Sequence, residues 1–130
     1  NTHLFSGASI VATNKSIVEK SFWTLMKDQK VTSFGGVPYF YEILKKIKFH
    51  KIVLPHLKYF TQAGGALDRD LIKYFLNYAK THKVKFIVMY GQTEATARMT
   101  YLPYGQAKKK IGSIGKPIPG GKIRLQNANV

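Results

Sequence analysis

The sequence predicts an α/β fold built on a parallel β-sheet. Short apolar runs of strand length alternate with longer segments whose apolar residues recur every three or four positions. Turns that contain glycine or proline separate these segments. A strand–helix–strand repeat forms right-handed crossovers, so the strands run parallel and the loops that follow them gather at one edge of the sheet.

The first part of the chain contains two predicted strands, at 8–13 and 31–34. A helix between them is expected to begin at Asn14 or Ser16, which are both favourable N-cap residues, and to run to about residue 29. Its predicted apolar stripe consists of Ile17, Phe22, Leu25 and Met26.

The middle of the chain continues this alternation. A second helix is predicted directly after Pro38, because proline is favoured in the first turn of a helix. A connector around Pro55 leads to a strand at 58–62, Asp68 can cap a third helix, and a strand at 85–89 follows. The predicted inward residues of the two helices are Phe40, Ile43, Leu44 and Ile47, then Leu71, Ile72, Phe75, Leu76 and Ala79.

The last part of the chain differs in composition. From about Lys108, glycine or proline occupies positions 112, 115, 117, 119, 120 and 121, which excludes a helix. Residues 122–126 alternate like a strand. We therefore predict an α/β subdomain at 1–107 and the start of a β-rich subdomain at 108–130.

Composition limits the possible functions. The chain has 130 residues, of which 45% are hydrophobic, and this suffices for one core. It has no cysteine, which excludes disulfides, thiolate metal sites and cysteine nucleophiles. The histidines at 3, 50, 56 and 82 lack paired ligand spacing. No apolar run reaches membrane-spanning length and no signal-like segment is visible, so we expect a cytoplasmic protein without a membrane span.

The formal net charge of +15 raises nucleic-acid binding as an alternative, because clustered basic residues contact phosphates. The 21 basic residues are mostly lysines at helical intervals and turn ends, without interleaved aromatic residues. This pattern favours a solvated surface, and nucleic acid is an unlikely partner.

The candidate ligand-binding side chains lie in the segment Tyr90-Gly91-Gln92-Thr93-Glu94, which follows the apolar run 86–89. Ligands gather at the carboxyl ends of strands in open α/β sheets, and Gly91 permits a sharp turn there. An aromatic face, a hydroxyl and a carboxylate suit a purine ring, a phosphate oxygen and a hard cation. Alternatively, Tyr90 could be a core-edge aromatic, Thr93 a helix cap and Glu94 a carboxylate at a helix N-terminus.

Four segments in order carry a family resemblance. They are Val31-Thr32-Ser33-Phe34-Gly35-Gly36-Val37-Pro38, Gly64-Gly65-Ala66-Leu67, Tyr90-Gly91-Gln92-Thr93-Glu94, and Gly112-Ser113-Ile114-Gly115-Lys116-Pro117-Ile118-Pro119-Gly120. Together they resemble the adenylate-forming superfamily of acyl-CoA synthetases, luciferases and peptide-synthetase adenylation domains, whose signature is Tyr-Gly-x-Thr-Glu. The resemblance covers nearly the whole chain. It implies a parallel β-α-β subdomain of the family's N-terminal domain, followed by the start of a β-rich segment.

The resemblance implies an activity and its cofactors. A carboxylate attacks the α-phosphate of ATP, pyrophosphate leaves, and a thiol accepts the acyl group from the acyl-adenylate. ATP and Mg²⁺ are then required, with coenzyme A or a carrier protein as acceptor. We lean to an acyl-CoA synthetase, and the carboxylic acid stays open.

The resemblance also implies roles for individual residues. Thr93 and Glu94 would be catalytic, with Thr93 bonding the α-phosphate and Glu94 binding Mg²⁺. The remaining nucleotide-binding residues would be Gly64, Gly65, Ala66, Tyr90, Gly91 and Gln92. The acyl pocket would be bordered by Gly35, Gly36, Val37, Thr96, Ala97 and Arg98. Arg98 could meet a carboxylate substrate or a Glu elsewhere in the fold.

Other family segments are absent from these 130 residues. They are the phosphate loop, the Thr-Gly-Asp that holds the ribose, the hinge, and the C-terminal domain with its lysine. We therefore expect a fragment of a larger enzyme that is inactive alone. The alternative from a different class is a non-catalytic basic binding module.

Overall fold

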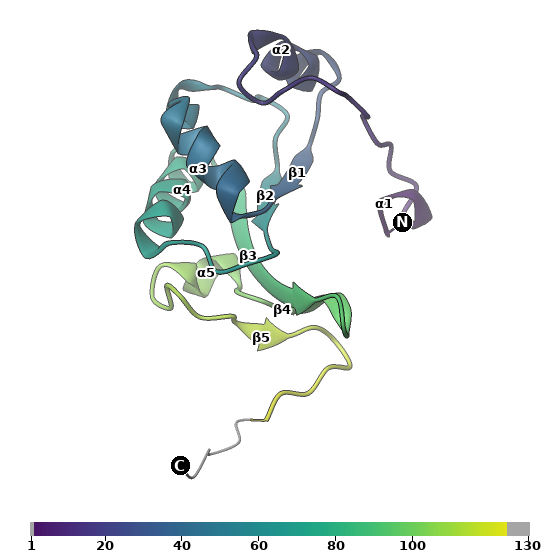
Figure 1. The fold of residues 1–130 in the computed structure, drawn as a ribbon, viewed down its shortest axis with the longest axis vertical. Helices are drawn as coiled ribbons and strands as arrows, with labels where there is room; N and C mark the ends of the chain where they lie inside the picture. The colour runs from purple at the N-terminus through teal and green to yellow at the C-terminus, as the bar shows by residue number, and fades with distance from the viewer. Residues whose placement is uncertain (1, 125–130) are drawn as a thin grey trace.

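The computed structural model describes residues 2–124 and confirms the α/β prediction. Its five-stranded sheet has the strand order β1-β2-β3-β4-β5 (Figure 1). The parallel strands are β1 (Ser33–Gly36), β2 (Tyr59–Gln62) and β3 (Lys85–Gln92). Antiparallel pairing adds β4 (Thr96–Tyr101) and β5 (Lys116–Pro117).

Two helices connect the parallel strands and pack beside them. They are α3 (Pro38–Lys46) and α4 (Arg69–Thr81), which contact each other and lie against β1–β3 in Figure 1. The other helices are α1 (Thr2–Phe5), α2 (Lys20–Asp28), η1 (Phe49–Lys51) and α5 (Tyr104–Ala107). The sheet thus has both parallel crossovers and an antiparallel extension.

The core is aromatic and lies between the parallel strands and the helices. Phe34, Phe60 and Phe86 are register partners on adjacent strands. The Phe60 ring stacks on Phe34 and Phe86, with centroid separations of 5.4 and 4.8 Å. Tyr41 of α3 and Phe75 of α4 close this cluster from the helix side, 4.9 Å apart. Alternate residues of each strand therefore face the helices, as the pleat requires.

Two helix starts occur where the sequence predicts them. Pro38 is the first residue of α3. Asp68 caps α4, because its Oδ1 accepts hydrogen bonds from the backbone N–H groups of Asp70 at 2.9 Å and Leu71 at 3.1 Å.

The predicted strand at 8–13 is wrong. These residues have no regular secondary structure and their side chains are exposed. A strand needs a neighbour that satisfies its backbone N–H and C=O groups, and no described segment pairs with this one. Apolar residues such as Ile10 therefore indicate a strand only where a partner exists.

The helix and strand before Pro38 begin later than predicted. Helix α2 begins at Lys20, after a turn in which Glu19 Oε1 accepts a hydrogen bond from the Ser16 N–H at 3.0 Å. The Val31 N–H donates to Met26 O at 3.0 Å and closes the end of this helix. The β1 ladder with β2 begins at Ser33.

The region after β3 differs most from the prediction. The predicted strand at 122–126 is wrong where it is described, because residues 121–124 have no regular structure, and 125–130 lie outside the described residues. Instead, β5 pairs with β4, and the Thr100 hydroxyl donates to Ile114 O at 2.5 Å. The division into parts at 1–107 and 108–130 stays a prediction.

Candidate functional site

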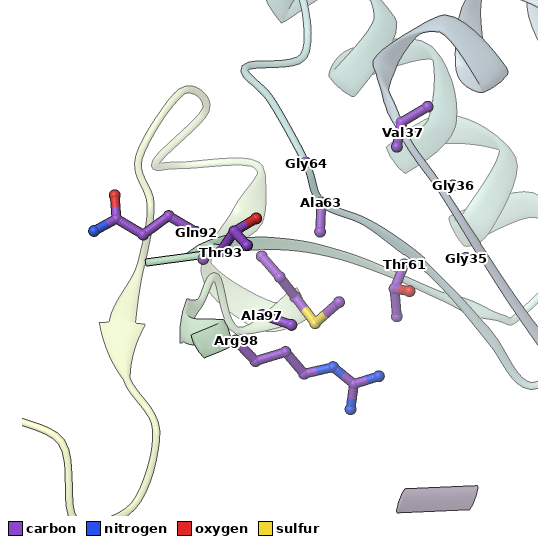
Figure 2. Close-up of a pocket in the computed structure, with 12 residues that line it drawn as sticks. Gly35, Gly36, Val37, Thr61, Ala63, Gly64, Gln92, Thr93, Ala97 and Arg98 are labelled. Atoms are coloured by element: carbon purple, nitrogen blue, oxygen red, sulfur yellow. The ribbon is translucent and has the colours of Figure 1, made fainter. Parts of the chain in front are cut away.

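A pocket of about 690 Å³ lies at the carboxyl ends of the three parallel strands. This volume lies within the range of small-molecule sites. Figure 2 shows its lining, which comes from the end of β1 and the following Val37, the end of β2 and its following loop, and the β3–β4 hairpin. The lining residues are Gly35, Gly36, Val37, Thr61, Ala63, Gly64, Met89, Gly91, Gln92, Thr93, Ala97 and Arg98.

The end of β1 is closely packed against β2. A Cβ on Gly35 would lie 2.7 Å from Thr61 Oγ1, so a larger residue would displace that side chain. Val37 is the N-cap of α3, and its side chain is half exposed at the pocket. The two glycines and Val37 therefore bring backbone, rather than bulky side chains, to this wall.

The loop after β2 is held from inside the protein. Gly64 has φ of +82°, a conformation that favours glycine. The buried Gln62 donates from Nε2 to Gly65 O at 2.8 Å, while its Oε1 has no hydrogen-bond partner among the described residues. The Gln62 side chain therefore fixes the loop that carries Gly64.

Tyr41 supports the same edge from beneath the sheet. Its hydroxyl donates to the backbone oxygen of Thr61 at 2.5 Å. Burial raises the pKa of the Tyr41 phenol, so the hydroxyl stays protonated and keeps donating. The core and the pocket wall thus share β2.

The Tyr-Gly-Gln-Thr-Glu segment forms a β-hairpin, which corrects the prediction of a sharp turn at Gly91. Strand β3 continues through Gly91 to Gln92, which pairs with Thr96 across an irregularity between Tyr90 and Gln92. Gly91 is required by close approach, since its Cβ would lie 2.6 Å from Thr96 O. No helix begins at Thr93 or Glu94, which excludes the alternative helix-terminal roles of these two residues.

Nine predicted site residues line the pocket together. They are Gly35, Gly36, Val37, Gly64, Gly91, Gln92, Thr93, Ala97 and Arg98. Five others lie in the same loops or strands but do not line it: Gly65, Ala66, Tyr90, Glu94 and Thr96. The Tyr90 ring is exposed, and its hydroxyl donates to Gln92 Oε1 at 3.4 Å.

Sequence reasoning missed Thr61, Ala63 and Met89. Strand alternation contained the signal for two of them. Phe60 and Phe86 face the helices, so Thr61 and Met89, at odd offsets from them, face the opposite side.

The charges of the site are few. Arg98 is the only charged residue that lines the pocket in the described part of the chain. Glu94 is exposed in the adjacent turn. No group of three or more His, Cys, Asp or Glu residues within 2–124 could hold a metal ion. One carboxylate such as Glu94 is nevertheless enough for Mg²⁺ when substrate phosphates and water supply the other ligands.

No helix within residues 2–124 is long and apolar enough to cross a bilayer.

Known proteins resemble this chain in sequence and in fold. The uncharacterized acyl-CoA ligase YtcI of Bacillus subtilis (strain 168) is 29% identical over 125 residues, which are 95% of this chain and 23% of that protein. The N-terminal domain of FACL13 from Mycobacterium tuberculosis superposes with a TM-score of 0.72 at 22% identity, over 88% of this chain and 28% of that one.

A second solved structure is similar over nearly the whole chain. O-succinylbenzoate coenzyme A synthetase (MenE) from Bacillus subtilis, in complex with ATP and magnesium ion, gives a TM-score of 0.76 at 18% identity, over 97% of this chain and 25% of that one. The chain thus spans about a quarter of the length of these proteins. The family model described as AMP-binding enzyme matches residues 1–129, and the chain belongs to this family of adenylate-forming enzymes.

Proposed function

We propose that the protein containing these residues is an ATP-dependent acid–thiol ligase. It converts a carboxylate and ATP into an acyl-adenylate and pyrophosphate, and then transfers the acyl group to the thiol of coenzyme A. The observation that carries the proposal is the pocket at the strand ends, where Gly64, Gly91 and Thr93 of two family-like segments converge.

Thr93 and Glu94 are the proposed catalytic residues. Nucleotidyl transfer depends on positioning and on neutralising charge more than on covalent help from the protein. The Thr93 hydroxyl lines the pocket and can donate to an α-phosphate oxygen. Glu94 stands two residues from Gln92 in an exposed turn without an ion pair within the described chain, so its carboxylate can serve as the ligand of Mg²⁺. When bound, Mg²⁺ would neutralise phosphate charge there.

The adenine subsite is proposed between the two glycine-containing loops. Gly64, Gly65 and Ala66 are exposed and can present backbone to a flat ring. The Tyr90 ring is also exposed and offers an aromatic face, with Gly91 and Gln92 beside it.

The acyl subsite is proposed along the end of β1, Val37 and strand β4. Its members are Gly35, Gly36, Val37, Thr96, Ala97 and Arg98. Coenzyme A is favoured as acceptor because the relative from Bacillus subtilis is named as an acyl-CoA ligase. A carrier protein is the alternative acceptor. Because the chain spans 23% of that relative, we propose that these residues alone do not catalyse the reaction.

Carboxylate-dependent ATP–pyrophosphate exchange tests the proposal. The complete protein is assayed with fatty, aryl and amino acids, and we expect exchange with one class. Glu94→Ala should lower that exchange by about 100- to 1000-fold, as the loss of one group that stabilises developing charge does. Glu42→Ala, an exposed carboxylate on α3, is the matched control and should keep full exchange. Unchanged exchange in Glu94→Ala would contradict the metal role, and no exchange with any acid would contradict the function.

A further inference from the structure

Arg98 is a cation without a matching anion in the pocket. The other lining residues within the described region are uncharged, and none is Asp or Glu. The one ion pair among residues 2–124 joins Lys73 and Asp70 at 2.9 Å, and both residues belong to helix α4. The guanidinium of Arg98 is therefore available to a ligand.

The position of Arg98 separates it from the proposed phosphate site. Figure 2 shows Gln92 and Thr93 on one side of the pocket, whereas the Arg98 side chain extends toward the side of Gly35 and Thr61. The reacting carboxylate must reach the α-phosphate beside Thr93. A group that Arg98 holds would thus belong to another part of the acid.

The charge and hydrogen-bonding capacity of the guanidinium determine which kind of substrate group Arg98 can bind. A guanidinium that a ligand covers loses its water, and this loss is unfavourable unless a partner accepts its hydrogen bonds. An apolar acyl chain has no such acceptor. A carboxylate accepts two parallel N–H···O bonds from the planar guanidinium, which is the strongest common pairing for arginine.

We propose that the acid substrate carries a second carboxylate, which Arg98 binds at the end of the pocket away from Thr93. This inference rests on the proposed ligase function. The substrate class is therefore a dicarboxylic acid, activated at the carboxylate near Thr93 and held at the other by Arg98. Arg98 acts here as a specificity-determining residue.

The test compares dicarboxylic acids with monocarboxylic acids of equal length in ATP–pyrophosphate exchange by the complete protein. Both aliphatic and aryl series are used, because the chain length is unknown. One charged hydrogen-bonded pair is worth a factor of about 10 to 100, so we expect kcat/KM to favour the diacid by at least that lower figure.

Substitution of Arg98 isolates its contribution. Arg98→Met should lower kcat/KM for the diacid by about 10- to 100-fold and lower the diacid-to-monoacid ratio of kcat/KM by a similar factor, with the KM for ATP unchanged. Arg98→Lys keeps the charge but loses the bidentate geometry, so it should give an intermediate loss. Arg69→Met, on α4 outside the pocket, is the matched control. Thermal unfolding checks that each variant is folded, and Arg98→Lys carries the test if Arg98→Met is not.

The outcomes distinguish failure of the dicarboxylate inference from failure of the proposed ligase function. If exchange with monoacids equals or exceeds exchange with diacids, and Arg98→Met does not alter this comparison, the dicarboxylate inference is overturned. The ligase function then still stands. An absence of exchange with every acid overturns the ligase function and this inference together.

Discussion

The parallel part of the sheet and the β3–β4 hairpin are built in opposite ways. In the parallel part, Phe60 has no exposed surface and packs against aromatic rings from β1, β3, α3 and α4. In the hairpin, every side chain from 92 to 98 is exposed. The difference shows that stability comes from one region and the candidate chemistry from the other.

The connection between the two regions is strand β3 itself. Its first half contributes Phe86 to the core, and its last residues, Gly91 and Gln92, line the pocket. Binding residues commonly lie on surface loops that a rigid scaffold positions. Changes in one region should therefore leave the other largely intact.

The largest expected effect on stability comes from the core. Phe60→Ala should lower the free energy of unfolding by about 3–5 kcal/mol, because it removes a buried ring and leaves a cavity among packed aromatic side chains. Urea denaturation of the complete protein measures this change. Tyr39→Ala, on the exposed side of α3, is the control and should change stability by no more than about 0.5 kcal/mol. Equal losses in both variants would contradict the described core.

A smaller effect is expected where the hairpin joins β3. Gly91→Ala would force a methyl group against the backbone oxygens of Thr96 and Ala97, and such overpacking destabilises by about 1–3 kcal/mol. The hairpin should shift and exchange activity should fall, while the aromatic core remains folded. Amide hydrogen exchange, which should quicken at 90–101 and stay slow in α4, measures this separation.

Gly105→Ala provides the control for that substitution. A Cβ at Gly105 would meet nothing within 4 Å, and the residue lies in helix α5. It should be neutral or slightly stabilising, since alanine favours helices. Faster amide hydrogen exchange across the core in Gly91→Ala would show that a change in the hairpin also disturbs the parallel part of the sheet.

The sequence predicts the parallel region well because its signals are local. Proline at the start of α3 and Asp68 before α4 act within one helical turn, and the apolar stripes repeat every three or four residues. The strand at 8–13 fails for the opposite reason, because a strand depends on a partner distant in sequence. Most residues of the candidate pocket could be found from motifs, whereas their placement could not.

Gly91 illustrates this limit. Its place in the motif indicates a ligand site, and its small size is equally consistent with a sharp turn or with close approach of another chain segment. Only the pairing of Gln92 with Thr96 shows that the second explanation holds. Thr61 and Met89 line the pocket through strand alternation rather than through any motif.

A modest effect is expected from the carboxylate that serves the scaffold. Asp68→Ala removes the acceptor of two backbone hydrogen bonds and should lower the free energy of unfolding by about 1 kcal/mol. Exchange activity should stay near that of the unaltered protein, because Asp68 does not line the pocket. Asp68→Asn retains an acceptor and should recover most of the stability. A loss in Asp68→Asn as large as in Asp68→Ala would contradict the capping role.

The smallest effect on stability is expected from the carboxylate that we propose as the Mg²⁺ ligand. Glu94 is exposed in the hairpin turn and forms no ion pair in the described part of the chain, so Glu94→Ala should change the free energy of unfolding by no more than about 0.5 kcal/mol. The same variant is expected to lose nearly all exchange activity. Measured side by side, Asp68→Ala and Glu94→Ala should thus show opposite responses in urea denaturation and in exchange. A stability loss in Glu94→Ala equal to that in Asp68→Ala would mean that this carboxylate supports the fold, and its low activity would then carry no evidence for metal binding.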